Sequence, residues 1–167
     1  MNKKHVKLAE EASKSLPHEV YVAPNLPIKD QVRVGVAVNV VKDGYYLLLK
    51  RKSELGTGTW CPPGGKMEFG ESIIDCALRE FREEVGNDIQ IEQPEFHCIT
   101  NDFFEKENQH FITIQLIAFY VSGEAIINEP DKFSDIGWFY TDNVEDMDLF
   151  LPTRNFFSNN LTTGDKL

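Results

Sequence analysis

Three glutamates, Glu80, Glu83 and Glu84, lie at helical spacing near the middle of the chain. On a helical wheel they fall within an arc of about 100°, and Glu80 and Glu84, four positions apart, lie one above the other. Like charges placed in this way destabilise a bare helix by roughly a few tenths of a kcal/mol. A hard divalent cation such as Mg²⁺ or Mn²⁺ would reverse that sign, because these ions prefer oxygen ligands. The spacing therefore predicts a metal site, and such a site is most useful where the ion also bridges substrate phosphates.

The residues around these glutamates predict the helix that must position them. Good helix formers without an internal proline begin near Ser72, and Gly86 stands where a C-terminal cap belongs. The apolar residues fall on a neighbouring arc that would face a core: Ile74, Ala77, Leu78, Phe81 and Val85.

An isolated acidic stretch of this kind is usually a solvated face, with Arg79 and Arg82 pairing with nearby glutamates. The wider spacing favours the functional interpretation. The stretch GKMEFGESIIDCALREFREEVG has the pattern GX5EX7REFXEEXG, where X is any residue. In this spacing it resembles the Nudix box. Phe81 is bulkier than the aliphatic residue of that motif, and Asn87 stands where the family has an aliphatic one. The matching positions are Gly65, Glu71, Arg79, Glu80, Glu83, Glu84 and Gly86.

The resemblance implies a fold and a set of roles. The fold would be an α/β/α sandwich with a mixed β-sheet, in which the box forms a loop-helix-loop. The cofactor would be Mg²⁺ or Mn²⁺, and the expected ligands are Gly64 through its carbonyl, Glu80, Glu83, Glu84 and Glu129. Outside the box Glu129 is favoured, and Glu107 and Glu124 remain alternatives. The residues expected to act in catalysis are Glu80, Glu83, Glu84, Arg79 and Glu71, with Arg79 orienting the carboxylates.

Three outer segments extend the resemblance: LLKRKSELGTGTWCPPGGKMEFGES, FFEKENQHFITI and NEPDKFSDIGWF. Together they are similar to the MutT-like nucleoside triphosphate diphosphatases, and more narrowly to the branch acting on oxidised or modified purine nucleotides. The implied reaction is attack of water on the β-phosphorus, which gives a nucleoside monophosphate and pyrophosphate. The alternatives are another substrate of the same fold, such as ADP-ribose, a nucleotide sugar or a dinucleoside polyphosphate, and a binding module without turnover.

The expected substrate contacts are Arg51, Gly65, Thr100 and Asn101. Arg51 lies between Lys50 and Lys52 in the one dense basic spot of the chain, which directly precedes the expected phosphate site. Further candidates for a base pocket are Phe103, His110 and Trp138, although core packing is the favoured role for the two aromatic residues.

Composition limits the partners. The chain has 167 residues and a net charge of −10, which argues against a nucleic-acid polymer as partner but not against a small nucleotide. No apolar run is long enough to span a membrane, and the N-terminus lacks the pattern of a signal peptide, so we expect a cytoplasmic enzyme. The three cysteines lack metal-ligand spacing and are expected to be reduced thiols. The sequence leaves a homodimer open.

The expected organisation is an N-terminal segment (1–31), with an amphipathic helix over 1–16 and a proline-rich linker, followed by a catalytic domain (32–167). Alternating and apolar patterns predict strands over 32–41, 45–51, 89–91, 96–100, 111–121 and 136–140. Helices are expected over 72–86, 141–147 and 151–161. Residues 101–109 are expected to form a polar hairpin tip, and 123–134 an acidic loop.

Overall fold

The computed structural model describes residues 31–144 and 146–163, so the expected N-terminal helix lies outside the described residues. In that part of the chain the strands form one mixed eight-stranded sheet. The strands are β1 (Val32–Lys42), β2 (Tyr45–Arg51), β3 (Trp60–Cys61), β4 (Gly64–Lys66), β5 (Gln90–Ile91), β6 (Glu95–Phe104), β7 (Gln109–Ser122) and β8 (Phe133–Tyr140). The helices are α2 (Ile73–Val85), α3 (Thr141–Val144) and α4 (Leu151–Thr163).

Strand β1 organises the sheet. It runs parallel to β7 over ten residue pairs, from Val32 opposite His110 to Val41 opposite Phe119. It pairs antiparallel with the short strand β4, and with β2 through a turn at Asp43 and Gly44, both of which have positive φ. That hairpin is the one predicted from the sequence, because Asp-Gly accommodates the two positive φ values that a two-residue turn needs.

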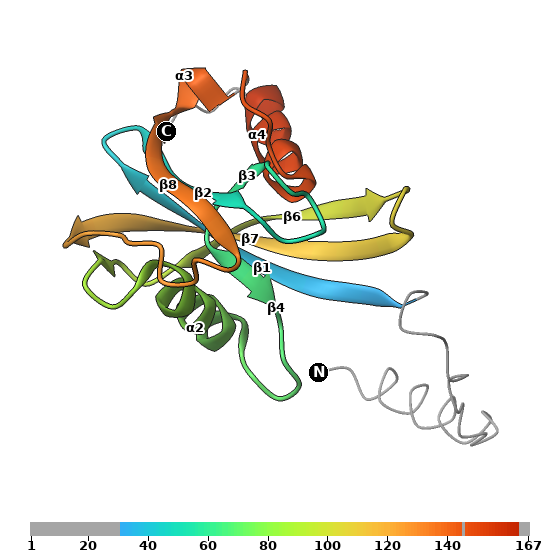
Figure 1. Ribbon diagram of the computed structural model, residues 1–167, viewed down its shortest axis with the longest axis horizontal. Helices are drawn as coiled ribbons and strands as arrows, with labels where there is room; N and C mark the ends of the chain where they lie inside the picture. The colour runs from blue at the N-terminus through green and yellow to red at the C-terminus, as the bar shows by residue number, and fades with distance from the viewer. Residues whose placement is uncertain (1–30, 145, 164–167) are drawn as a thin grey trace, which may run out of the picture.

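Helices cover both faces of the sheet, with α2 on one side and α4 on the other (Figure 1). Alternate residues of β2 enter two separate cores: Leu47 and Leu49 pack in the core with α2, and Tyr46 and Leu48 in the core with α4. The nearly continuous apolar run of this strand had predicted burial on both faces, which is confirmed. The α/β/α sandwich is thus the observed architecture.

Several boundaries differ from expectation. The expected hairpin tip over 101–109 is wrong, because β6 continues to Phe104 and only 105–108 form the turn. The polar residue inside this extension, Asp102, is fully buried and hydrogen-bonded, so its polarity does not mark a loop. Strands β3 and β4 are too short for a periodic signal. No helix in the described ranges is long and apolar enough to cross a membrane.

Candidate active site

Helix α2 begins and ends where its sequence predicts. The Ser72 hydroxyl accepts a hydrogen bond from the Asp75 amide at 3.1 Å and caps the N-terminus. Gly86 ends the helix with φ of 84°, which suits glycine at this position. One side of the helix packs against the sheet through Cys76, Ala77, Phe81 and Val85. Leu78, expected on that side, is only partly buried.

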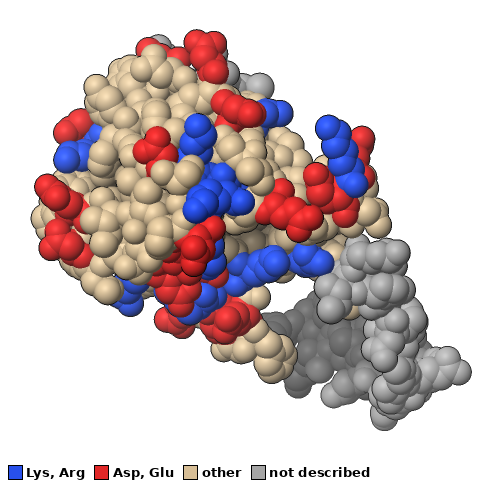
Figure 2. Space-filling model, viewed as in Figure 1, with Lys and Arg blue, Asp and Glu red and all other residues tan. Residues whose placement is uncertain are grey.

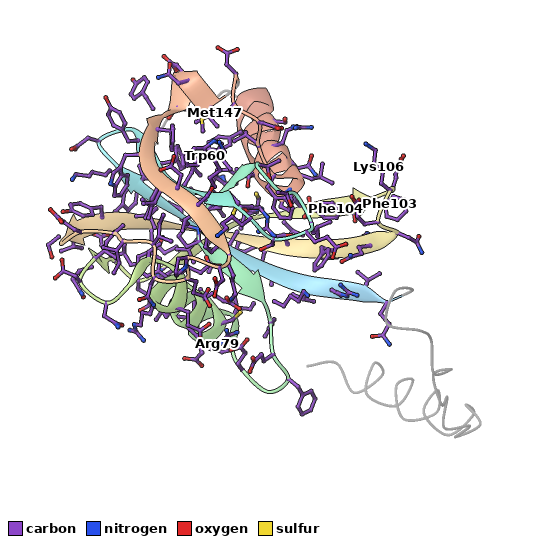
Figure 3. All side chains as sticks on the ribbon, in the orientation of Figure 1. Trp60, Arg79, Phe103, Phe104, Lys106 and Met147 are labelled. Carbon is purple, nitrogen blue, oxygen red and sulfur yellow. The ribbon has the colours of Figure 1, made fainter. Side chains whose placement is uncertain are left out.

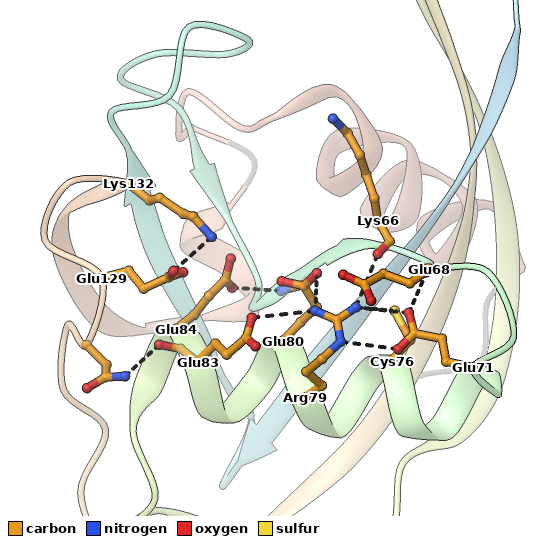
Figure 4. A network of polar contacts seen from close by, with 12 residues as sticks. Lys66, Glu68, Glu71, Cys76, Arg79, Glu80, Glu83, Glu84, Glu129 and Lys132 are labelled. Atoms are coloured by element: carbon orange, nitrogen blue, oxygen red, sulfur yellow. Dashed lines mark hydrogen bonds and ion pairs between the residues drawn. The ribbon is translucent and has the colours of Figure 1, made fainter. Parts of the chain in front are cut away.

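The three glutamates of α2 do not share one environment. Glu80 and Glu84 are buried, with exposed fractions of 8% and 3%, and both line one cavity. Glu83 has a side chain that is 48% exposed and is not among the residues lining that cavity. Figure 4 shows Glu80 and Glu84 facing β4, whereas Glu83 lies beside Arg79. The i, i+4 pair thus contributes two carboxylates to one enclosed space.

Two glycines of β4 allow the backbone to approach these carboxylates closely. The Gly64 amide donates a hydrogen bond to Glu84 Oε2 at 2.8 Å. A Cβ on Gly65 would lie 2.2 Å from Glu80 Oε1, so no larger residue fits there without displacing Glu80. Gly64 adopts φ of 156°, and a Cβ on it would meet the Val36 carbonyl oxygen at 2.2 Å. Gly65 therefore lets Glu80 pack against the β4 backbone, and Gly64 lets β4 approach β1 closely.

Arg79 connects the carboxylates to one another (Figure 4). Its guanidinium makes a two-pronged contact with Glu71 at 2.9 and 3.2 Å, and it also donates to Glu80 Oε1 at 2.9 Å. A longer contact of 3.5 Å reaches Glu83. The hydrogen bonds from Arg79, together with the Glu68 amide, lower the pKa of Glu71 to about 2. Arg79 thus fixes the orientation of Glu80 from outside the cavity.

The acidic loop before β8 brings Glu129 close enough for its charge to act on Glu84, although Glu129 is not among the residues lining the cavity. The Asn128 side-chain Nδ2 donates to the Glu83 backbone carbonyl at 2.8 Å, and the Asn128 backbone N–H donates to the Glu84 backbone carbonyl at 3.0 Å. These bonds use carbonyl groups that the end of a helix leaves unpaired. Glu129 Oε1 pairs with Lys132 Nζ at 2.9 Å, whereas Glu129 Oε2 is buried without a partner among the described residues. A buried carboxylate oxygen left unpaired is costly unless something binds it.

Burial raises the pKa of Glu84 to about 8, with the nearby charges of Glu80 and Glu129 acting in the same direction. The Gly64 hydrogen bond and Lys132 oppose this shift. Such crowding of buried carboxylates, with one oxygen orphaned, fits a divalent cation with hard oxygen ligands. In the part of the chain that the structure describes, no three acidic, histidine or cysteine groups yet converge as a ready-made metal cluster. A side chain of Glu80, Glu84 or Glu129 would have to rotate to bring three carboxylates together around one ion.

The cavity has a volume of about 1050 Å³ and extends from these glutamates to the β6–β7 turn. Its lining carries charges of both signs, and Figure 2 shows lysine and arginine side chains beside acidic ones across the middle of this face. Its far wall is aromatic, and Figure 3 shows Phe104 and Lys106 where β6 turns into β7. The lining includes the cations Arg33, Arg51, Lys66, Lys106 and Lys132 and the rings Phe104, Phe111, Phe150.

The expected substrate residues separate into two groups. Arg51 and Gly65 line the cavity, and the Arg51 guanidinium lies 4.1 Å from the centre of the Phe150 ring. Thr100 is buried beneath the sheet surface, and Asn101 is exposed and bonds to His110, so neither lines the cavity. Phe103 and Trp138 are not among the lining residues either. Of the alternative acids, Glu107 lines the cavity and Glu124 does not.

Some lining residues had no sequence signal. Lys132 and Phe150 belong to segments far from the box, and only the fold brings them to it. Phe104 could have been found from the FFEKENQHF segment, which the resemblance places beside the nucleotide, but its neighbour Phe103 was the residue singled out there. Cys61 also lines the cavity, but burial raises the pKa of its thiol to about 11, so it is a neutral thiol rather than a nucleophile.

The chain is similar to known proteins over most of its length. Residues 29–159 match the family model for the NUDIX domain. The chain is 29% identical over 133 residues to the nucleoside triphosphatase NudI of Enterobacter sp., across 75% of this chain and 94% of that protein. It is 34% identical over 105 residues to the NAD-capped RNA hydrolase NudC of Stutzerimonas stutzeri, across 63% of this chain and 36% of that protein.

A solved structure gives the same result. The MutT NUDIX hydrolase of Burkholderia pseudomallei is 32% identical, with a TM-score of 0.67 over 81% of this chain and 99% of that one. Enzymes of this family generally use divalent metal ions. The family model spans well over half of the chain, and the predicted resemblance is confirmed: the protein belongs to the NUDIX family as a MutT-like pyrophosphohydrolase.

Proposed function

We propose that the protein hydrolyses a nucleoside triphosphate, with oxidised or modified purines as the candidate bases, to the monophosphate and pyrophosphate. The observation that carries this proposal is the cavity itself. It holds the buried pair Glu80 and Glu84, and its lining also includes five cations, three further glutamates (Glu54, Glu68 and Glu107) and phenylalanine rings. That combination of surfaces suits a polyanion joined to a flat ring system.

The chain's own residues supply binding and orientation. Arg51, Lys66 and Lys132 offer positive charge to phosphate oxygens, and Gly65 lets the Glu80 carboxylate lie close to the β4 backbone. Glu80, Glu84 and Glu129 would hold Mg²⁺ or Mn²⁺, with Glu83 and the Gly64 carbonyl as further candidate ligands. When bound, such an ion neutralises charge on phosphate oxygens and activates water for attack. Arg79 keeps Glu80 in position through its bond to Glu71.

A product assay tests the proposal. Purified protein is incubated with Mg²⁺ and a panel of nucleoside triphosphates, including oxidised purine triphosphates, in water enriched in ¹⁸O. We expect a monophosphate and pyrophosphate, with the label in the pyrophosphate because water attacks the β-phosphorus. Orthophosphate and a diphosphate as products would contradict the proposal. Activity should disappear with EDTA and return with Mg²⁺, and hydrolysis that persists without metal would argue against a metal-dependent reaction.

The same panel should include ADP-ribose, a nucleotide sugar and a dinucleoside polyphosphate. The cavity is open enough for such diphosphate derivatives, and the relatives include the hydrolase NudC. Two monophosphates from one of these compounds, with no turnover of any triphosphate, would replace our proposal by this alternative.

A further inference from the structure

The floor of the cavity is built from alternate residues of the two central parallel strands. Arg33 and Gly35 of β1 lie opposite Phe111 and Thr113 of β7, and all four line the cavity. Thr113 is the hydroxyl-bearing residue among these four, and it sits directly beside the glycine of the pair. The other three residues have no acceptor side chain, so Thr113 Oγ1 is the side-chain acceptor there, beside the backbone carbonyl oxygen of Gly65.

A buried carboxylate controls that hydroxyl. Asp102 of β6 is fully buried, and its Oδ2 accepts hydrogen bonds from Thr113 Oγ1 at 2.6 Å and Thr100 Oγ1 at 2.9 Å. Its Oδ1 accepts from Asn155 Nδ2 of α4 at 2.8 Å. Three donors therefore converge on this carboxylate, which has no donor of its own to return.

A backbone carbonyl fixes the direction of the Thr100 bond. Gln115 Nε2 donates to the Pro152 carbonyl oxygen at 3.3 Å, and a carbonyl can only accept. The same nitrogen donates to Thr100 Oγ1 at 3.2 Å, so the Thr100 hydrogen must point to Asp102. Thr113 also gives its hydrogen to Asp102, and among the described residues its oxygen makes no second hydrogen bond. Thr113 Oγ1 therefore has free lone pairs and no hydrogen to offer the cavity.

Gly35 leaves the approach to this oxygen open. A Cβ on Gly35 would lie 3.4 Å from Thr113 Oγ1, within the space that a ligand atom could take. The aromatic wall lies in the same cavity, where the Phe104 and Phe150 rings are 5.3 Å apart with their planes 32° from one another. Aromatic faces favour a flat ring as the ligand group beside them.

We infer that Thr113 Oγ1, its hydrogen held by Asp102, accepts a hydrogen bond from an N–H group of the substrate's base, and so selects bases that carry a donor on the edge facing Gly35. This inference rests on the proposed triphosphate hydrolysis and extends it to the chemistry of the base. A base with only acceptor atoms at that edge would place its lone pairs against those of Thr113 Oγ1, with no proton between them. A site that hydrogen-bonds a substrate group rejects analogues that lack this group.

The test uses pairs of triphosphates in which one member lacks a donor of the other. Purine riboside and inosine lack an amino group of adenosine and guanosine, and 1-methylguanosine and 3-methyluridine carry a methyl group in place of an N–H hydrogen of guanosine and uridine. For at least one pair, we expect the kcat/KM of the wild-type enzyme to be about 10-fold or more lower for the triphosphate that lacks the donor than for the one that carries it. Thr113→Val should lower kcat/KM for the donor-bearing member and bring the ratio of that pair close to one. Thr113→Ser, which keeps the oxygen, should restore the ratio.

Thr100→Val is the matched control, because it removes the other hydroxyl from the same Asp102 oxygen yet lies outside the cavity lining. It should lower the melting temperature as Thr113→Val does while keeping the wild-type ratio. Gly35→Ala gives a second route if Thr113→Val folds poorly, since the added methyl group would fill the approach and raise KM for the donor-bearing substrate.

The outcomes separate the two proposals. Turnover of triphosphates with equal kcat/KM across every pair would overturn this inference and leave the proposed function standing. A ribose-against-deoxyribose ratio that Thr113→Val abolishes would assign the donor to a sugar hydroxyl and also overturn the base assignment. No turnover of any triphosphate would overturn both.

Discussion

The Gly64 amide donates to Glu84 Oε2 at 2.8 Å and so ties β4 to the last turn of α2, twenty positions further along the chain. Glu84 is 3% exposed, and this bond is the one hydrogen bond that its carboxylate makes among the described residues. The charges of Glu80 and Glu129 lie close enough to raise its pKa, and Glu84 lines the cavity. The bond thus fixes the Glu84 side chain at the cavity wall and leaves lone pairs of its oxygens for a cation.

Glu84→Gln should lower kcat by at least about 100-fold and leave the fold intact. The amide keeps the size of the side chain and can still accept from Gly64, but it carries no charge for a cation. Turnover should be measured under saturating Mg²⁺ and the fold checked by circular dichroism. Glu92→Gln, an exposed acid beyond β5, is the control and should retain full activity. Near-normal turnover of Glu84→Gln would remove this carboxylate from the mechanism.

The raised pKa of Glu84 predicts a pH dependence of stability in metal-free protein. Its pKa is about 8 in the folded chain against 4.5 as the reference value, so between these two pH values the folded state holds a proton that the unfolded state has lost. The free energy of unfolding should therefore fall as pH rises from about 4.5 to about 8, and level off above that. Urea unfolding of EDTA-treated wild type and Glu84→Gln across this range isolates the contribution, because the variant lacks the group. Parallel curves for the two proteins would show that the pKa is not raised.

The sequence predicted the elements with strong periodicity and missed what depends on tertiary contact. The α2 boundaries followed from Ser72 and Gly86, and burial of β2 on both faces followed from its apolar run, because these signals are local. Asp102 shows the limit of such reasoning. Its polarity suggested a loop, whereas Thr113 and Asn155, far away in the sequence, satisfy it inside the structure. Lys132 likewise reaches the site only because Asn128 ties its loop to the end of α2.

Gly65→Ala should reduce kcat/KM by about 10- to 100-fold with little loss of stability. A Cβ there would lie 2.2 to 2.5 Å from the Glu80 carboxylate, which is the movable end of a side chain and can rotate away. The fold would survive this movement, but Glu80 would leave its position in the cavity. A combined measurement of melting temperature and kinetics tests the idea. A variant that unfolds, or one that works normally, would show that Gly65 does not act through Glu80.

Glu129→Gln should weaken binding of the divalent ion by roughly 10-fold or more, whereas Glu107→Gln and Glu124→Gln should not. All three acids are candidates by sequence. Glu129 differs from the other two because its Oε2 is buried without a partner in the described part of the chain, and because its charge acts on Glu84. Glu107 lies at the β6–β7 turn, and Glu124 is exposed near Asp88. Direct titration with Mn²⁺, in which the electron paramagnetic resonance signal reports the free ion, measures metal binding separately from turnover. If Glu107→Gln instead weakens binding while Glu129→Gln does not, the orphaned oxygen of Glu129 has another purpose, and the ion lies nearer the aromatic end of the cavity.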